Sequence, residues 1–95
     1  MPKGYVISRV DITNPDAYAR YAAAATKAIA DYGGKPLARG GRSEALEGTA
    51  RARNVVLEFE SYDAARRYFH SEQYQAARVL RDGAADIEMV LVEGV

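Results

Sequence analysis

The succession of strand and helix patterns constrains this chain more than any other feature of its sequence. "GYVISRVDI", Gly4–Ile12, is rich in β-branched residues and runs directly into a helix start, where Asn14 can cap the helix and Pro15 suits its first turn. Two further strand patterns, a broken helical pattern and a last apolar stretch, "DIEMVLVEGV", follow. The order β-α-β-β-α-β predicts a ferredoxin-like α+β fold, with two helices on one face of an antiparallel sheet.

Serine and glycine residues mark where the helices begin and end. The first helix is expected to stop at Gly33 or Gly34, since glycine readily adopts the positive φ that ends many helices. Ser61 is the expected N-cap of the second helix. Ser71, directly before "EQYQAARVLRDG", is a further N-cap that restarts this helix, and Gly83 stops it. We therefore expect a second helix that is broken at Ser71.

The two middle strands differ in the strength of their patterns. "NVVLEF" lies in a clear strand over Arg53–Phe59, whereas the strand from Leu37 to about Leu46 is weak because "GG" interrupts it. Gly40 and Gly41 indicate either a β-bulge or a close approach of the backbone to a neighbour.

Both terminal strands are apolar on both faces. In the first strand, Tyr5 and Ile7 point away from Val6 and Val10. In the last strand, one face carries Ile87, Met89 and Leu91 and the other carries Val90 and Val92. Two helices cover one face of a sheet, and the second face would expose a larger apolar patch than soluble monomers usually show. A sheet from another copy is the simplest cover, so we expect a homodimer built face to face.

Length and charge limit the number of domains and the class of partner. The 95 residues suit one domain spanning residues 1–95. Thirteen basic and thirteen acidic residues give a formal charge of zero, so we expect neither nucleic acid nor an anionic membrane as a partner. The first residues contain no long apolar run and no small-residue cleavage site, which predicts a cytoplasmic protein.

The residues that usually bind metals and cofactors are scarce. The sequence has no cysteine and one histidine, which leaves no conventional transition-metal site. No motif indicates a nucleotide or a flavin, because no Gly-Lys-Ser/Thr follows the paired glycines and no parallel βαβ unit carries them. We expect a protein without a metal or a cofactor.

The motif "ARGGR" is the first candidate binding site. The guanidinium of Arg39, with backbone N–H groups freed by Gly40 and Gly41, would suit a carboxylate or a phosphate. The alternative is a glycine bulge that bends the strand, in which Arg39 and Arg42 pair with nearby carboxylates: Glu44, Glu47 or Glu58.

Two further charged features are expected to be structural. "RAR", Arg51–Arg53, is interpreted as a solvated loop edge. Glu58 lies in the middle of a hydrophobic strand and needs a partner if it is buried, which Arg9 or Arg39 on a neighbouring strand could supply.

His70 is the second candidate site, because histidine changes charge near neutral pH. It is the best candidate for a general base, and the alternative is a hydrogen-bonded structural histidine. Ser71 is explained by capping but adjoins the same candidate site, and Tyr74 can bury its ring while its hydroxyl reaches a cavity. Tyr32 and Tyr68 would form the apolar wall of a ligand pocket.

Several segments together resemble the family called domain of unknown function 1330: "PKGYVISRVDITNPDAY", "YGGKPLARGGRSEALEG", "VVLEFESYDAARRYFHSEQYQAAR" and "VLVEGV". The resemblance covers nearly the whole chain and implies a dimeric α+β barrel, in which two ferredoxin-like sheets face each other. The superfamily that it resembles includes cofactor-free monooxygenases, muconolactone isomerases, haem proteins and stress-inducible barrels. The fold therefore does not choose a function.

Three functional hypotheses follow from the residues and the resemblance. The first is a dimeric barrel that binds a small apolar or aromatic acid between sheet and helices, with Arg39 on the acid and His70 and Tyr74 close by. The second is a cofactor-independent enzyme, monooxygenase-like or isomerase-like, with His70 as general base. The third is a structural or stress-related dimeric module without a ligand.

Overall fold

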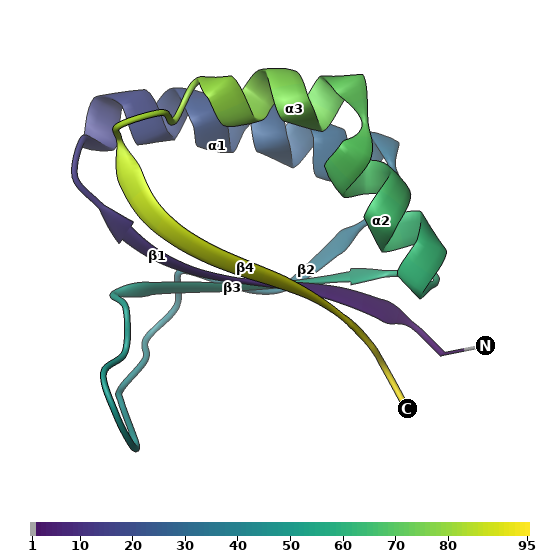
Figure 1. Ribbon diagram of the computed structural model, residues 1–95, viewed down its shortest axis with the longest axis horizontal. Coiled ribbons are helices and arrows are strands. Elements are labelled where there is room, and N and C mark those ends of the chain that lie inside the picture. The colour runs from purple at the N-terminus through teal and green to yellow at the C-terminus, as the bar shows by residue number, and fades with distance from the viewer. Residues whose placement is uncertain (1) are drawn as a thin grey trace.

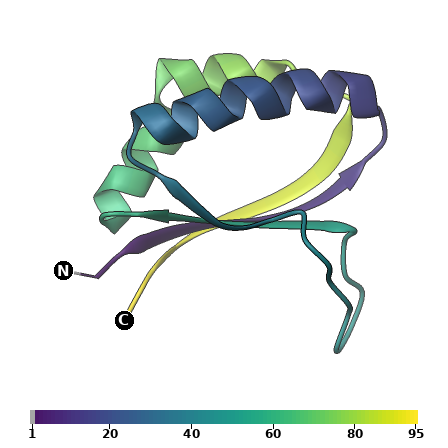
Figure 2. The ribbon, with the colours of Figure 1, turned by 180° about the vertical axis from the view of Figure 1, so that it is seen from behind.

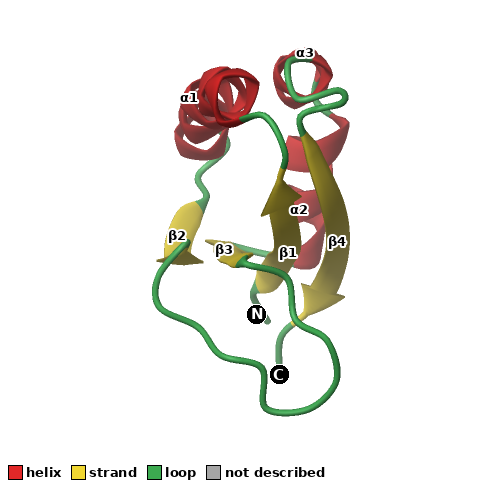
Figure 3. Ribbon diagram, turned by 90° about the vertical axis from the view of Figure 1, so that its left-hand side faces the viewer, coloured by secondary structure: helices red, strands yellow, loops and turns green. Residues whose placement is uncertain are grey.

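In the computed structural model, which describes residues 2–95, the chain forms a sheet with helices on one side. In chain order the elements are β1 (Gly4–Ile12), α1 (Pro15–Asp31), β2 (Lys35–Arg39), β3 (Arg53–Phe59), α2 (Tyr62–His70), α3 (Glu72–Val79) and β4 (Ala85–Glu93). The strands pair antiparallel in the order β2-β3-β1-β4. All three helices lie over the same face of this sheet (Figures 1 and 3). The predicted ferredoxin-like α+β fold is confirmed.

Side-chain caps place the helix ends where the sequence predicts them. The side chain of Asn14 accepts a hydrogen bond from the backbone N–H of Ala17 at 3.3 Å, and that of Ser61 accepts one from Ala64 at 3.0 Å. Ser71 is at once the C-cap of α2 and the N-cap of α3, with extended backbone at ψ 150°. Gly33 follows α1 with a φ of 75°. The predicted break in the second helix is confirmed.

Strand β2 is shorter than its pattern predicts. It ends at Arg39 and not near Leu46, because Gly40 takes a φ of 70° and the chain leaves the sheet. The register of β2 on β3 shifts between Pro36 and Ala38, so the bulge lies before the paired glycines. Residues 40–52 form a long β2–β3 loop that descends on the side of the sheet opposite the helices (Figures 1 and 2).

An aromatic cluster fills the core between helices and sheet. Tyr74, Phe59 and Tyr68 are 0%, 1% and 2% exposed. The ring centre of Tyr68 lies 4.9 Å from that of Phe59 and 4.8 Å from that of Tyr74. The hydroxyls of Tyr21 and Tyr74 satisfy each other at 2.8 Å inside this cluster. Tyr32, the C-cap of α1, is 39% exposed and meets the ring of Tyr68 edge-on at 6.5 Å.

The second face of the sheet is open and partly apolar. Ile7 on β1 lies opposite Val56 on β3 and Val90 on β4, and all three side chains point away from the helices. Val90 and Val92 are 54% and 43% exposed. Met89 points the other way and packs against the core. The two-faced pattern predicted for the terminal strands is therefore present, and it assigns Ile7 to the open face.

The buried hydroxyl pair should show strong coupling in stability. Tyr21→Phe or Tyr74→Phe leaves one buried hydroxyl without its partner, so each should lower the free energy of unfolding by about 1–3 kcal/mol. The double variant removes both hydroxyls and should lose less than the sum of the two single losses. Urea denaturation followed by circular dichroism measures all four proteins. Additive losses would mean that the two hydroxyls do not depend on each other.

Candidate functional site

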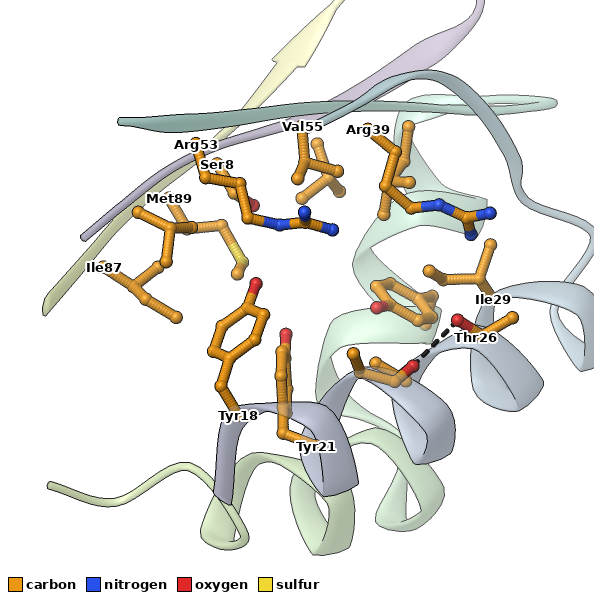
Figure 4. A pocket seen from close by; sticks show the side chains of 16 residues that line it. Ser8, Tyr18, Tyr21, Thr26, Ile29, Arg39, Arg53, Val55, Ile87 and Met89 are labelled. Atoms are coloured by element: carbon orange, nitrogen blue, oxygen red, sulfur yellow. Dashed lines mark hydrogen bonds between the residues drawn. The ribbon is translucent and has the colours of Figure 1, made fainter. Parts of the chain in front are cut away.

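A cavity lies between α1 and the helix-facing side of the sheet (Figure 4). Its volume is about 50 Å³. Aliphatic side chains from β1, β3 and β4 form its floor, and the rings of Tyr18, Tyr21 and Tyr68 form much of its wall. Two cationic side chains, Arg39 and Arg53, lie among these apolar groups. We call this space the arginine pocket.

Arg53 is the first residue of β3 and points into the arginine pocket (Figure 4). It precedes Val55 and Leu57 on the same face of the strand, which places its side chain under the helices. Its guanidinium carbon lies 5.7 Å from the ring centre of Tyr18, within cation–π range. Its Nε is buried and has no hydrogen-bond partner within residues 2–95. The interpretation of Arg51–Arg53 as a solvated loop edge was wrong for this residue.

Arg39 enters the arginine pocket from the neighbouring strand. It pairs with Val55 in the register of β2 on β3, and this register places its side chain on the helix-facing side. It is more exposed than Arg53 and lies at the pocket rim. Within residues 2–95, the ion pairs join Lys27 to Asp31 and Arg51 to Asp11 and Glu88. The structure therefore brings two guanidinium groups to one pocket without a carboxylate that neutralises either.

Gly40 shapes this end of the pocket. A Cβ on Gly40 would overlap Nη1 of Arg53, so only glycine lets that guanidinium lie against the chain here. Of the two alternatives given for the paired glycines, the structure shows the close approach, at Gly40 and not at Gly41. The N–H of Gly40 donates to the carbonyl of Asn54 at 3.0 Å, so it is not free to bind an anion as the motif suggested.

Tyrosine hydroxyls in the pocket wall remain protonated. Burial raises the pKa of Tyr21 and of Tyr68 far above the ordinary tyrosine value. Behind Tyr21 lie Tyr74, whose hydroxyl is 2.8 Å away, and Arg81, whose guanidinium carbon is 5.2 Å from the Tyr21 ring centre. Tyr21 and Tyr68 therefore offer hydrogen-bond donors to an anion but not a base.

The other predicted site residues lie elsewhere. His70 lines a second cavity, between α2 and β4, and contacts the ring of Phe69 edge-on at 5.2 Å. The structure does not bring His70 beside Arg39. Ser71 donates its hydroxyl to the carbonyl of Tyr68 at 2.7 Å and accepts from the N–H of Tyr74 at 3.0 Å, so its polar atoms serve the helix break. Tyr74 lies behind the wall of the arginine pocket, where it contacts the Tyr21 hydroxyl and the ring of Tyr68.

The carboxylate of Glu58 has a different partner from those predicted. Glu58 lies on the open face and accepts a hydrogen bond from the hydroxyl of Tyr5 at 3.1 Å. Arg9 instead donates to the backbone carbonyl of Thr49 at 3.0 Å. Tyr5 is the neighbour of Glu58 in the register of β1 on β3, a pairing that single-strand patterns do not reveal.

Within residues 2–95, no three side chains of His, Cys, Asp or Glu gather closely enough to hold a metal ion. No helix in the same range combines the length and apolar character needed to cross a bilayer.

The architecture and the pocket define a ferredoxin-like α+β protein with two arginines between sheet and helices. Residues 3–95 match the model of one family, Domain of unknown function (DUF1330), and the chain belongs to this family. The resemblance seen in the sequence is confirmed. No curated protein matches the chain.

Solved structures share the fold at low sequence identity. A protein of unknown function from Rhodopseudomonas palustris has a TM-score of 0.71 and 20% identity, over 99% of this chain and 83% of that one. A dimeric ferredoxin-like protein of unknown function from Thermobifida fusca has a TM-score of 0.64 and 17% identity, over 97% and 91%. A putative antibiotic biosynthesis monooxygenase from Caulobacter crescentus has a TM-score of 0.65 and 15% identity, over 99% and 91%. At such identities the likeness shows the fold alone.

Sequence reasoning missed Arg53, although a signal for it was present. Arg53 begins the clear strand and alternates with Val55 and Leu57, which predicts the same inward face for all three. Arg53 was predicted to belong with Arg51 to a charged loop, where no such alternation is expected. Arg51 is indeed outside the pocket and pairs with Asp11 and Glu88.

Gly40 and Gly48 offer a matched test of how Arg53 is placed, because both have positive φ, 70° and 73°. Gly40→Ala adds a Cβ at positive φ and against Arg53, so we expect a loss of about 1–2 kcal/mol in the free energy of unfolding. Gly48→Ala adds the same backbone strain but meets no atom within 4 Å, so it should lose less. Chemical denaturation of both variants gives the comparison. Equal losses would show that the position of the Arg53 guanidinium does not depend on Gly40.

Proposed function

We propose that this protein binds a small organic acid with an apolar or aromatic body in the arginine pocket. The observation that carries the proposal is the pair of guanidinium groups, Arg39 and Arg53, that share this pocket without a neutralising carboxylate within residues 2–95. Arg53 is partly buried, and a cation withdrawn from water is costly unless it is paired, so a carboxylate ligand would supply the pair. The unpartnered Nε of Arg53 supports the same reading.

The size and lining of the arginine pocket indicate how such an acid fits. About 50 Å³ of open space suits a carboxylate group with a few waters. A bound ring requires further room, which Arg53 and Met89 can provide by changing rotamer because both side chains are long and flexible. Tyr18 and the aliphatic floor then contact the apolar body, while Tyr21 and Tyr68 offer hydroxyl donors.

We propose ligand binding at the arginine pocket and assign no catalytic step to it. A general base must lie within hydrogen-bond reach of the proton that it removes, directly or through one water. His70 lines the cavity beside α2 and β4, so a ligand held by Arg39 and Arg53 has no access to it in this arrangement. The relationship in fold to a putative monooxygenase adds no catalytic residue to the arginine pocket.

Isothermal titration with benzoate, salicylate and phenylacetate tests the binding proposal. Arg53→Gln and Arg39→Gln should each weaken the tightest of these acids by roughly 10- to 150-fold, which corresponds to about 1.5–3 kcal/mol for a charge-assisted hydrogen bond. Arg42→Gln is the matched control, because Arg42 lies on the exposed loop outside the arginine pocket. Benzamide, the neutral analogue of benzoate, should bind weakly to all four proteins. Equal affinity in the wild type and Arg53→Gln would contradict the proposal.

We also propose that the protein forms a homodimer through the open face of its sheet. Ile7, Val56, Val90 and Val92 make this face apolar, and no helix covers it within residues 2–95. The Thermobifida fusca protein of the same fold is described as dimeric. A face-to-face pair of sheets would bury the four side chains in both subunits.

Ile7→Asp tests this assembly, because it places a charge at the centre of the open face. We expect the variant to be monomeric by light scattering while the wild type is dimeric, with a helical circular dichroism spectrum that shows retained folding. Val79→Asp is the matched control, since Val79 is 62% exposed on α3. Met89→Asp should instead perturb the core, because Met89 faces the helices. A wild type that stays monomeric at micromolar concentration would rule out the dimer.

A further inference from the structure

The β2–β3 loop, residues 40–52, projects from the open side of the sheet (Figures 1 and 3). Its base is fastened to the sheet at several points. Arg51 donates to Glu88 at 2.8 Å and to Asp11 at 2.9 Å, and the backbone N–H of Ala52 donates to Asp11 at 3.0 Å. Arg9 donates to the carbonyl of Thr49 at 3.0 Å. The loop is therefore directed toward the side on which a face-to-face partner would lie.

The middle of this loop, in sequence, carries an exposed apolar side chain between two acids. Leu46 is 88% exposed, and Glu44 and Glu47 flank it. Within residues 2–95, neither glutamate takes part in an ion pair. Leu46 thus exposes apolar surface on a fastened loop, and association with a partner would bury it.

The cavity between α2 and β4 has the complementary character. Phe69, Leu91 and Val90 give it apolar walls, and Arg66 and His70 add basic groups. Its volume is about 230 Å³, larger than that of the arginine pocket. Because β4 is an edge strand and the side chain of Val90 points to the open face, the cavity is accessible around the sheet edge from the partner's side.

We propose that Leu46 of each subunit inserts into the α2–β4 cavity of its partner. Glu44 and Glu47 of the inserting loop then lie against the partner's Arg66 and the partner's His70, so the apolar anchor and the opposite charges match together. Two-fold symmetry repeats the contact, which gives two identical insertions per dimer. This inference rests on the proposed homodimer and adds to it a specific contact outside the sheet faces. It gives His70 a role in assembly.

Cysteine cross-linking tests the contact, because the natural sequence contains no cysteine. Leu46→Cys and Arg66→Cys chains are purified separately, mixed, and oxidised with copper phenanthroline. We expect a disulfide-linked species of twice the chain mass that forms in the mixture and disappears on reduction. Each chain then carries one cysteine, so any disulfide joins two copies, and each variant oxidised alone gives the background of like-with-like cross-links. A mixture of Leu46→Cys with Val79→Cys is the control and should not cross-link efficiently.

Sedimentation analysis of the dimer equilibrium gives a second, independent measure. Leu46→Ser should raise the dimer dissociation constant at least tenfold, and Val79→Ser should leave it unchanged. Glu44→Arg with Glu47→Arg should weaken the dimer, and Arg66→Glu in the same chain should restore part of the loss. A wild-type dimer with no cross-link and no effect of Leu46→Ser would overturn the insertion while leaving the homodimer. A monomeric wild type would overturn both.

Discussion

Three helices can bury only one face of a four-stranded sheet, and the rest of this structure follows from how each face is used. On the covered face, Phe59, Tyr68 and Tyr74 form a dense aromatic core, and the two central hydroxyls satisfy each other. The same face holds two arginines where the packing is less complete. The open face keeps apolar side chains that no helix of residues 2–95 covers. The proposed ligand site and the proposed dimer interface thus lie on opposite sides of one sheet.

The sequence predicted most boundaries because the signals that set them are local. Each helix cap accepts a hydrogen bond from the backbone N–H three residues later, as Asn14, Ser61 and Ser71 do. Such a cap can be recognised from a few neighbouring residues. The end of β2 at Arg39 was not predicted, because paired glycines can also mark an irregularity within a longer strand and the loop beyond is fixed by contacts with distant strands. The partner of Glu58 depends on strand register in the same way.

The candidate site was only partly predictable for a related reason. Arg39 and Tyr68 were both named from the sequence, and the structure brings them to one pocket. Arg53 shares this pocket because its strand, β3, pairs with β2, which carries Arg39. That pairing forms across a long loop. His70 was predicted to lie near Arg39 because the two side chains suit the same ligand. The structure instead places His70 at the α2–β4 cavity and Arg39 at the arginine pocket. Residue type suggested the reactive groups, whereas strand order decided which of them share a space.

The single residue Ser71 divides the helical layer into parts with different attachments. α2 packs against β1, β3 and β4, whereas α3 packs mainly against α1. At the far end of α3, the carbonyl of Ala84 accepts hydrogen bonds from the N–H groups of Thr13 and Asn14, which ties that end to the start of α1. α1 and α3 are thus held together, and the chain links them to the sheet and to α2 at Thr13–Asn14, Gly33, Ser71 and Ala84. A joint movement of α1 and α3 away from the sheet would enlarge the arginine pocket while α2 kept its packing on the sheet.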